Sequence, residues 1–208
     1  RYATPVGGVA SLPLEDGSRI TLNTDSKVRV IFSGRQRQVD LSQGEAFFEV
    51  APDGNRPFVV QAGDRRVVAV GTKFSVRREG DVIQVVVTEG HVRVDNGEIA
   101  KSVGAQATAA DQRTTPIMLS AGSVVRARND DVVVENHPLA EAEEILSWRS
   151  GYVMFRETRL DDAVAEFNRY NARQIVIRDA SVAAMQLTGK FRATNSDAFV
   201  NLLQQTYG

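Results

Sequence analysis

The chain has 208 residues, of which 42% are hydrophobic and 25% charged, and it contains no cysteine. Its formal net charge of −1 excludes a basic nucleic-acid-binding surface, and the lack of cysteine excludes disulfides and thiol catalysis. The longest apolar runs span four residues, as in Val67–Val70, whereas a transmembrane helix needs about 20.

Residues 1–128 are predicted to form strands almost throughout. Apolar and polar residues alternate with a period of two in several short, β-branched-rich runs separated by turn residues. The runs are Arg19–Asn23, Lys27–Phe32, Phe58–Gln61, Val67–Val70, Val82–Val87 and Val124–Ala127. This pattern favours a mainly β domain, either an antiparallel two-sheet sandwich or a solenoid of hairpins.

A weak internal repeat places a glycine three residues after an aliphatic residue, immediately before a new strand. The four copies end at Gly17, Gly44, Gly90 and Gly122. Glycine accepts the positive φ of tight hairpin turns, so each copy is expected to reverse the chain between paired strands.

The pattern changes near residue 129, which divides the chain into residues 1–128, a linker of residues 129–150 and a small α+β domain of residues 151–208. The linker is predicted to hold a short strand, Val132–Val134, and a helix that begins after Pro138 and stops at Gly151. The α+β domain is predicted to run β-α-β-β-α, an order that calls for one more strand, so a truncated unit is expected. Its strands are Tyr152–Phe155, Gln174–Arg178 and Met185–Arg192, and its helices end at Tyr170 and begin at Ser196.

No pattern in the sequence indicates catalysis, a metal or a cofactor. The two histidines are far apart and have no cysteine or acidic cluster beside them. Glu45 and Glu49 share one face of a strand, as a glycosidase pair would, but no aromatic sugar platform is near them. Two basic pairs, Arg65-Arg66 and Arg77-Arg78, are predicted to lie at solvated turns.

Four segments are more specific, and in their order and spacing they resemble the periplasmic domain of the FecR family over residues 4–98. They are Leu14–Asn23, Arg37–Val50 with its Gly-Glu-Ala-Phe-Phe-Glu-Val sequence, Arg56–Val60 and Val70–Val76. Three distal pieces resemble the later part of the same family, where it carries a unit similar to the secretin and TonB short N-terminal domain. These are Trp148–Phe155, the helix to Tyr170 and Leu187–Phe191.

The resemblance implies the periplasmic region of a single-pass inner-membrane regulator of an extracytoplasmic-function sigma factor. Such an anti-sigma factor or activator receives its signal from an outer-membrane TonB-dependent transducer that has bound a siderophore, which links it to iron uptake. The membrane helix and the sigma-binding part are expected to lie outside this chain, which begins at Arg1. Two other classes stay open: a carbohydrate-binding or hydrolysing β protein of the envelope, and a secretin-like assembly component.

The transducer's periplasmic signalling domain is expected to dock on residues 151–208, because a small sheet there must leave an edge for an incoming strand. Trp148, beside a helix stop, is either an anchor in the core or at the domain junction, or a ligand contact. The candidate partner-binding residues are Trp148, Tyr152, Val153, Phe155, Ile175, Val176 and Ile177. No nucleic acid and no small-molecule substrate are expected.

Overall fold

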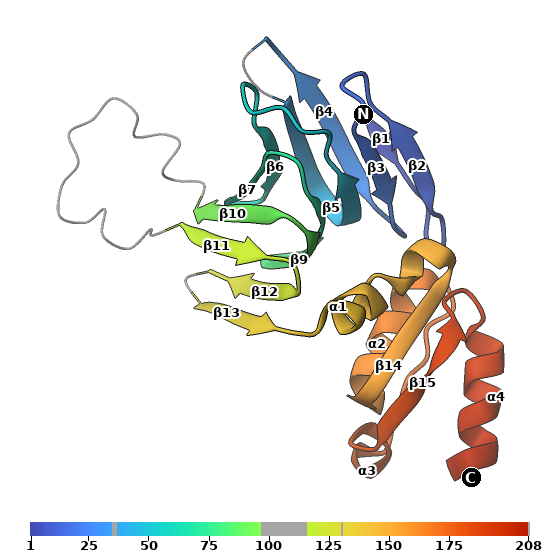
Figure 1. Cartoon of the computed structure of the whole chain (residues 1–208). Coiled ribbons are helices and arrows are strands. Elements are labelled where there is room, and N and C mark those ends of the chain that lie inside the picture. Colours follow the sequence, from blue (N-terminus) through green and yellow to red (C-terminus); the bar gives the residue numbers. More distant parts are fainter. Residues whose placement is uncertain (35–36, 97–115, 130, 208) are drawn as a thin grey trace.

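The structure is a computed structural model that describes residues 1–34, 37–96, 116–129 and 131–207. Figure 1 shows a curved β part, coloured blue to yellow, and a smaller α+β part in orange and red. The chain passes once from the first part to the second.

Within the described residues, the β part contains thirteen strands. They are β1 (Tyr2–Ala3), β2 (Ala10–Pro13), β3 (Arg19–Leu22), β4 (Lys27–Phe32), β5 (Arg37–Glu49), β6 (Phe58–Ala62), β7 (Arg65–Ala69), β8 (Lys73–Glu79), β9 (Val82–Glu89), β10 (His91–Asn96), β11 (Ile117–Ser120), β12 (Ser123–Arg128) and β13 (Asp131–Asn136). The α+β part contains α1 (Leu139–Ile145), the short 3₁₀ helix η3 (Ser147–Ser150), β14 (Tyr152–Arg159), α2 (Leu160–Tyr170), α3 (Ala180–Ala183), β15 (Gln186–Arg192) and α4 (Ser196–Tyr207).

The thirteen strands form one sheet that folds over at β5 into two layers, like half of a barrel. The first half of β5, Arg37–Leu41, pairs with β4 and β6, whereas the second half, Gly44–Glu49, pairs with β3 and β8. The layer that starts from the first half continues through β7, β10 and β11, and the other continues through β9, β12 and β13. Both layers turn their apolar residues toward one core.

The predicted sandwich was antiparallel, and this holds for every pair except one. β6 runs parallel to β5, with Arg37 opposite Phe58 and Leu41 opposite Ala62. The reason is the length of β5. The strand continues into the second layer, so the chain must return before it can place β6 beside the start of β5.

Three of the four repeat glycines do not make the hairpins that the sequence predicted. All four have positive φ, of 85° at Gly17, 83° at Gly44, 77° at Gly90 and 90° at Gly122. Only Gly17 lies between paired strands, β2 and β3. Gly44 lies at the bend inside β5, and Gly90 and Gly122 join strands of different layers. Three of the four copies, those at Gly44, Gly90 and Gly122, therefore mark places where the chain changes layer.

Replacing Gly44 with alanine is expected to lower the free energy of unfolding by about 2–4 kcal/mol. The new Cβ would lie 2.6 Å from Cα of Ser26 and 2.7 Å from the carbonyl oxygen of Asp25, at a φ of 83°. Gly80 also has positive φ, but nothing lies within 4 Å of its Cβ position. Gly80→Ala is therefore the matched control, and urea denaturation that shows equal losses for the two variants would contradict a steric role for the bend.

The α+β part has two antiparallel strands, β14 and β15, with a bulge between Phe155 and Thr158. The helices α2 and α4 cover one face of this small sheet. Phe167 of α2 and Phe199 of α4 stack with ring centroids 4.0 Å apart, and both rings pack against Phe191 of β15. The apolar stripe predicted for α2 is buried.

The predicted strand Gln174–Arg178 is extended but pairs with no described strand, so the expected β-α-β-β-α order is wrong at this element. A side chain takes the place of a neighbouring strand. The Asn168 amide donates to the carbonyl oxygen of Ile175 at 2.9 Å and accepts from its backbone N–H at 2.8 Å. The segment is held against α2 while its other backbone edge stays open.

Candidate functional site

The two parts of the molecule meet in a hydrophobic cluster that belongs to both. Phe47 of β5, Val86 of β9 and Val124 of β12 lie on the outer face of the second layer and pack with Leu146 and Trp148. The guanidinium of Arg149 also lies over the Phe47 ring, 4.1 Å from its centroid. These contacts bury apolar surface from both parts, so the junction is a packed interface.

Glu45 is the polar centre of this junction. Its side chain is 7% exposed, and its carboxylate accepts hydrogen bonds from four donors. Oε1 accepts from Trp148 Nε1 at 2.9 Å and from Ser75 Oγ at 3.1 Å. Oε2 accepts from Asn23 Nδ2 at 2.9 Å and from Arg169 Nη2 at 3.0 Å. One carboxylate of the β part thus holds both η3 and α2.

A chain of alternating charges extends from Glu45 along the junction. Arg169 contacts Glu166 Oε1 at 2.6 Å and Glu79 Oε1 at 3.0 Å. Arg77 of β8 contacts Glu166 Oε2 at 2.8 Å and Glu79 Oε1 at 2.6 Å. Glu79 and Glu166 each contact both arginines, so the charges of Arg77 and Arg169 are balanced within the network.

The protonation states of this network are held by its surroundings. Burial raises the pKa of the Glu166 carboxyl, but the charges of Arg169 and Arg77 outweigh it, so the pKa stays below its ordinary value. Burial, reinforced by Glu166 and Glu45, raises the pKa of the Tyr170 hydroxyl. That hydroxyl accepts from Asn23 Nδ2 at 2.8 Å and donates to Glu166 at 3.4 Å. Both groups keep a single charge state at neutral pH, which suits a structural lock.

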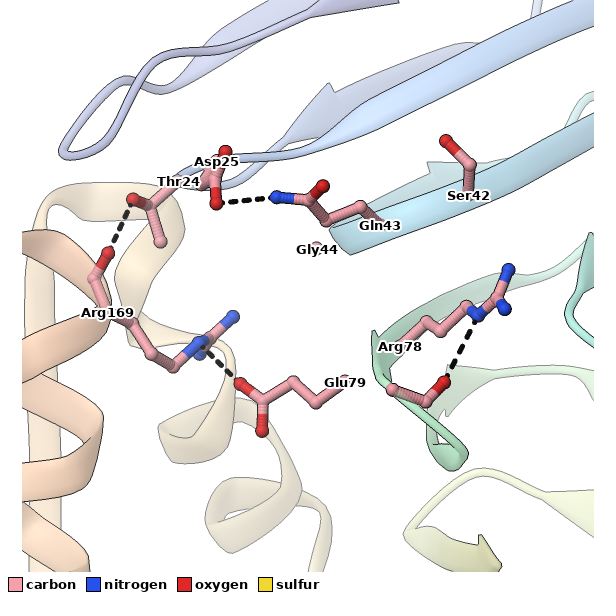
Figure 2. A pocket seen from close by; sticks show the side chains of 9 residues that line it. Thr24, Asp25, Ser42, Gln43, Gly44, Arg78, Glu79 and Arg169 are labelled. Atoms are coloured by element: carbon pink, nitrogen blue, oxygen red, sulfur yellow. Dashed lines mark hydrogen bonds and ion pairs between the residues drawn. The ribbon is translucent and has the colours of Figure 1, made fainter. Parts of the chain in front are cut away.

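A cleft of about 440 Å³ opens beside the network. Figure 2 shows Arg169 directed toward Glu79, and Gln43 bonded to Asp25 at 2.5 Å. The carbonyl of Arg169 accepts from Thr24 Oγ1 at 2.9 Å. These polar side chains are therefore engaged with one another. Within the described residues, no group of three or more His, Asp or Glu side chains is arranged to hold a metal ion.

A larger groove, of about 540 Å³, lies between the β part and β14. Its lining includes four of the predicted partner-binding residues, Trp148, Tyr152, Val153 and Phe155. Trp148, Val153 and Phe155 are only 2%, 4% and 6% exposed, so their side chains serve the core and the junction. Tyr152 is half-buried, with Lys190 Nζ 4.5 Å from its ring centroid. Trp148 lies in the junction, where its Nε1 donates to Glu45.

The other three predicted residues lie together on the extended segment Gln174–Arg178, apart from that groove. Ile175 and Ile177 are half-buried and pack against the core of the α+β part, whereas Val176 is 76% exposed. Because Ile175 turns its backbone N–H and C=O toward Asn168, those of Val176 point the other way. They have no partner among the described residues.

Sequence reasoning did not identify most of the junction. Arg65 and Arg77 were placed at solvated turns, but they lie in β7 and β8; Arg65 is buried and Arg77 binds Glu166. Glu45 appeared only as half of an acidic pair. Its partner in that pair, Glu49, instead lies at the surface, 3.9 Å from Arg19. The two acids that a hydrolase would need as a pair, Glu45 and Glu49, therefore contact different partners.

No helix within the described residues is long and apolar enough to cross a membrane. No curated protein matches the sequence. Two crystal structures of a candidate anti-sigma factor from Parabacteroides distasonis, at 1.65 and 2.50 Å resolution, are similar to this fold. They have TM-scores of 0.73 and 0.72 and sequence identities of 21% and 22%, and the match covers 100% of this chain and 91% of theirs.

The family comparison concerns the β part. Residues 1–93 match the family model described as FecR protein. This range contains the four amino-terminal motifs and includes Asn23, Glu45, Ser75 and Arg77 of the junction. Over residues 1–93, the β part of the chain therefore matches the FecR family.

Proposed function

We propose that this chain is the periplasmic sensor region of a transmembrane anti-sigma regulator. It receives a signal from an outer-membrane TonB-dependent siderophore transducer and relays it to an extracytoplasmic-function sigma factor. The family match and the likeness to a candidate anti-sigma factor support this role. The sigma-binding portion would belong to a cytoplasmic part of the protein outside this sequence.

The observation that carries the proposal is the open backbone edge of the segment Gln174–Arg178. An exposed edge with unpaired N–H and C=O groups is a template for an incoming strand. The transducer's signalling domain would supply that strand. Val176 would then become an inner residue of a new ladder, and Asn168 would hold the other edge of the segment in place.

The junction explains how docking on the α+β part would reach the rest of the protein. The helix α2 carries Asn168, which binds the docking segment, and also Arg169 and Tyr170, which bind the Glu45 and Asn23 side chains of the β part. A displacement of the segment Gln174–Arg178 would therefore act on Asn168, then on its neighbour Arg169 in α2, and through Arg169 on Glu45 of the β part. We propose that the signal passes along α2 into this network.

Calorimetric titration of the full 208-residue chain with the transducer's signalling domain tests the proposal. Val176→Pro removes the outward N–H but leaves the bonds of Ile175 intact, and it should weaken binding about five-fold, the effect of one backbone hydrogen bond of about 1 kcal/mol. Val176→Thr keeps the N–H and a similar side-chain volume, so it should bind like the parent chain. Undiminished binding by Val176→Pro would place the docking site elsewhere, and a lack of binding by the parent chain would reject the transducer as partner.

A further inference from the structure

The strand β13 ends one layer of the β part and has an unprotected edge. It pairs with β12 over all six of its residues, with no bulge, and has no second strand partner among the described residues. Val133 and Val134 are 57% and 46% exposed. The strand contains no proline or lysine, two of the devices that keep sheet edges from pairing, and its two charged residues, Asp131 and Glu135, flank the valine run Val132–Val134.

The pairing with β12 determines which backbone groups of β13 are free. His137 N–H donates to the Gly122 carbonyl at 2.9 Å, immediately beyond the end of the strand. In an antiparallel ladder the bonded residues alternate, so Glu135 and Val133 also face β12. Val132, Val134 and Asn136 therefore direct their N–H and C=O groups outward.

We propose that β13 pairs antiparallel with β13 of a second copy of this chain, about a two-fold axis at Val134. In an antiparallel ladder, consecutive facing pairs alternate between hydrogen-bonded and non-hydrogen-bonded types. A two-fold axis makes the pairs on its two sides identical, so it can only pass through a pair in which a residue faces its own copy. Val134 is the central residue of the three whose backbone groups point outward. With the axis at Val134, the outward N–H and C=O groups of Val132, Val134 and Asn136 can all bond to the partner subunit.

Charge argues against the two registers next to this one. An axis at Val133 would place Asp131 opposite the partner subunit's Glu135, and an axis at Glu135 would place two glutamates opposite each other; like charges directly opposite are destabilising. An axis at Val134 instead places Asp131 opposite the partner subunit's His137 and Val132 opposite the partner subunit's Asn136. This register contains no like charges directly opposite each other, so two copies of the edge can pair without that repulsion.

The burial of the strand agrees with this occupant. Val132 is half-buried and packs against the β core, and Ile117 of β11 does the same at the end of the other layer. The two layers therefore stop with their last apolar residues partly in water. With a second copy, the sheet would continue across the two-fold axis, and Val134 would lie between β12 of its own chain and β13 of the partner subunit.

Single-cysteine cross-linking tests the pairing, because the chain has no cysteine of its own. Val134→Cys places two sulfurs opposite each other at the axis, within reach of a disulfide. We expect it to form covalent dimers at least about ten times faster than Met118→Cys, which is 64% exposed on the edge strand β11. Equal rates for the two variants would overturn the proposal.

Sedimentation equilibrium over a range of concentrations provides the second measurement. The parent chain should show a reversible monomer–dimer equilibrium, and Val134→Lys should weaken it about ten-fold by placing two ammonium groups together at the axis. Met118→Lys is the control and should leave the equilibrium unchanged. Circular dichroism confirms that both variants are folded. A parent chain that stays monomeric, or a dimer unaffected by Val134→Lys, contradicts pairing through β13.

Discussion

Replacing Glu45 with alanine is expected to lower the free energy of unfolding by about 3–5 kcal/mol. The substitution leaves Trp148 Nε1 without its acceptor, takes one of the two acceptors of Asn23 Nδ2, and removes one counterion of Arg169 in a buried site. A buried donor that loses its acceptor bears its full desolvation cost. Because the donors come from both parts of the molecule, the loss should also loosen the junction. Urea denaturation followed by tryptophan fluorescence measures it, since Trp148 is the one tryptophan of the chain.

Glu49→Ala is the matched control for this variant. Glu49 lies four residues further along the same strand, on the same face, but its carboxylate is 42% exposed and lies 3.9 Å from an exposed Arg19. A surface ion pair of this kind contributes about 0–1 kcal/mol. A Glu45→Ala variant no less stable than Glu49→Ala would show that the junction does not depend on this carboxylate.

Asp16→Ala is expected to lower the free energy of unfolding by a similar amount, about 3–5 kcal/mol, at a second site inside the β part. Asp16 Oδ2 lies 2.7 Å from Arg37 Nη1, with the two side chains 4% and 0% exposed. Without Asp16, the Arg37 guanidinium keeps the carbonyls of Arg56 and Ala51 but has no counterion. Asp40→Ala is the control, because Asp40 pairs at 2.6 Å with Arg29, whose side chain is 51% exposed.

The stability contributed by Asp16 should depend on pH in a defined direction. Burial raises the pKa of this carboxyl, but hydrogen bonds from Ser18 and Arg37 outweigh it and hold the pKa below its ordinary value of 3.8. A lowered folded-state pKa gives stability that is complete above the ordinary pKa and is lost as the pH falls through the folded value. The difference between the parent chain and Asp16→Ala should therefore be constant near pH 7 and shrink below about pH 4. A difference that grows on acidification would contradict this assignment.

The sequence by itself determined that the β part consists of strands, where glycines are needed and which family the chain resembles. Strands such as Lys27–Phe32 follow from the alternation of apolar and polar residues, because that alternation depends only on neighbours along the chain. The stripe of α2 is equally local, and its residues from Leu160 to Tyr170 are buried as its helical spacing predicts. The FecR motifs are contiguous stretches, so they too are visible without a fold.

Only the tertiary structure decided what these elements meet. The sequence could not show that β5 belongs to both layers. The positive φ of Gly44 fits a hairpin turn between two strands as well as a bend within one strand. It could not single out Glu45, whose donors lie 22, 30, 103 and 124 residues away along the chain. It assigned Gln174–Arg178 to a strand because the pattern of Ile175–Ile177 suits one. Whether an extended segment becomes a strand depends on a neighbour to pair with, and here Asn168 of α2 holds one edge and leaves the other open.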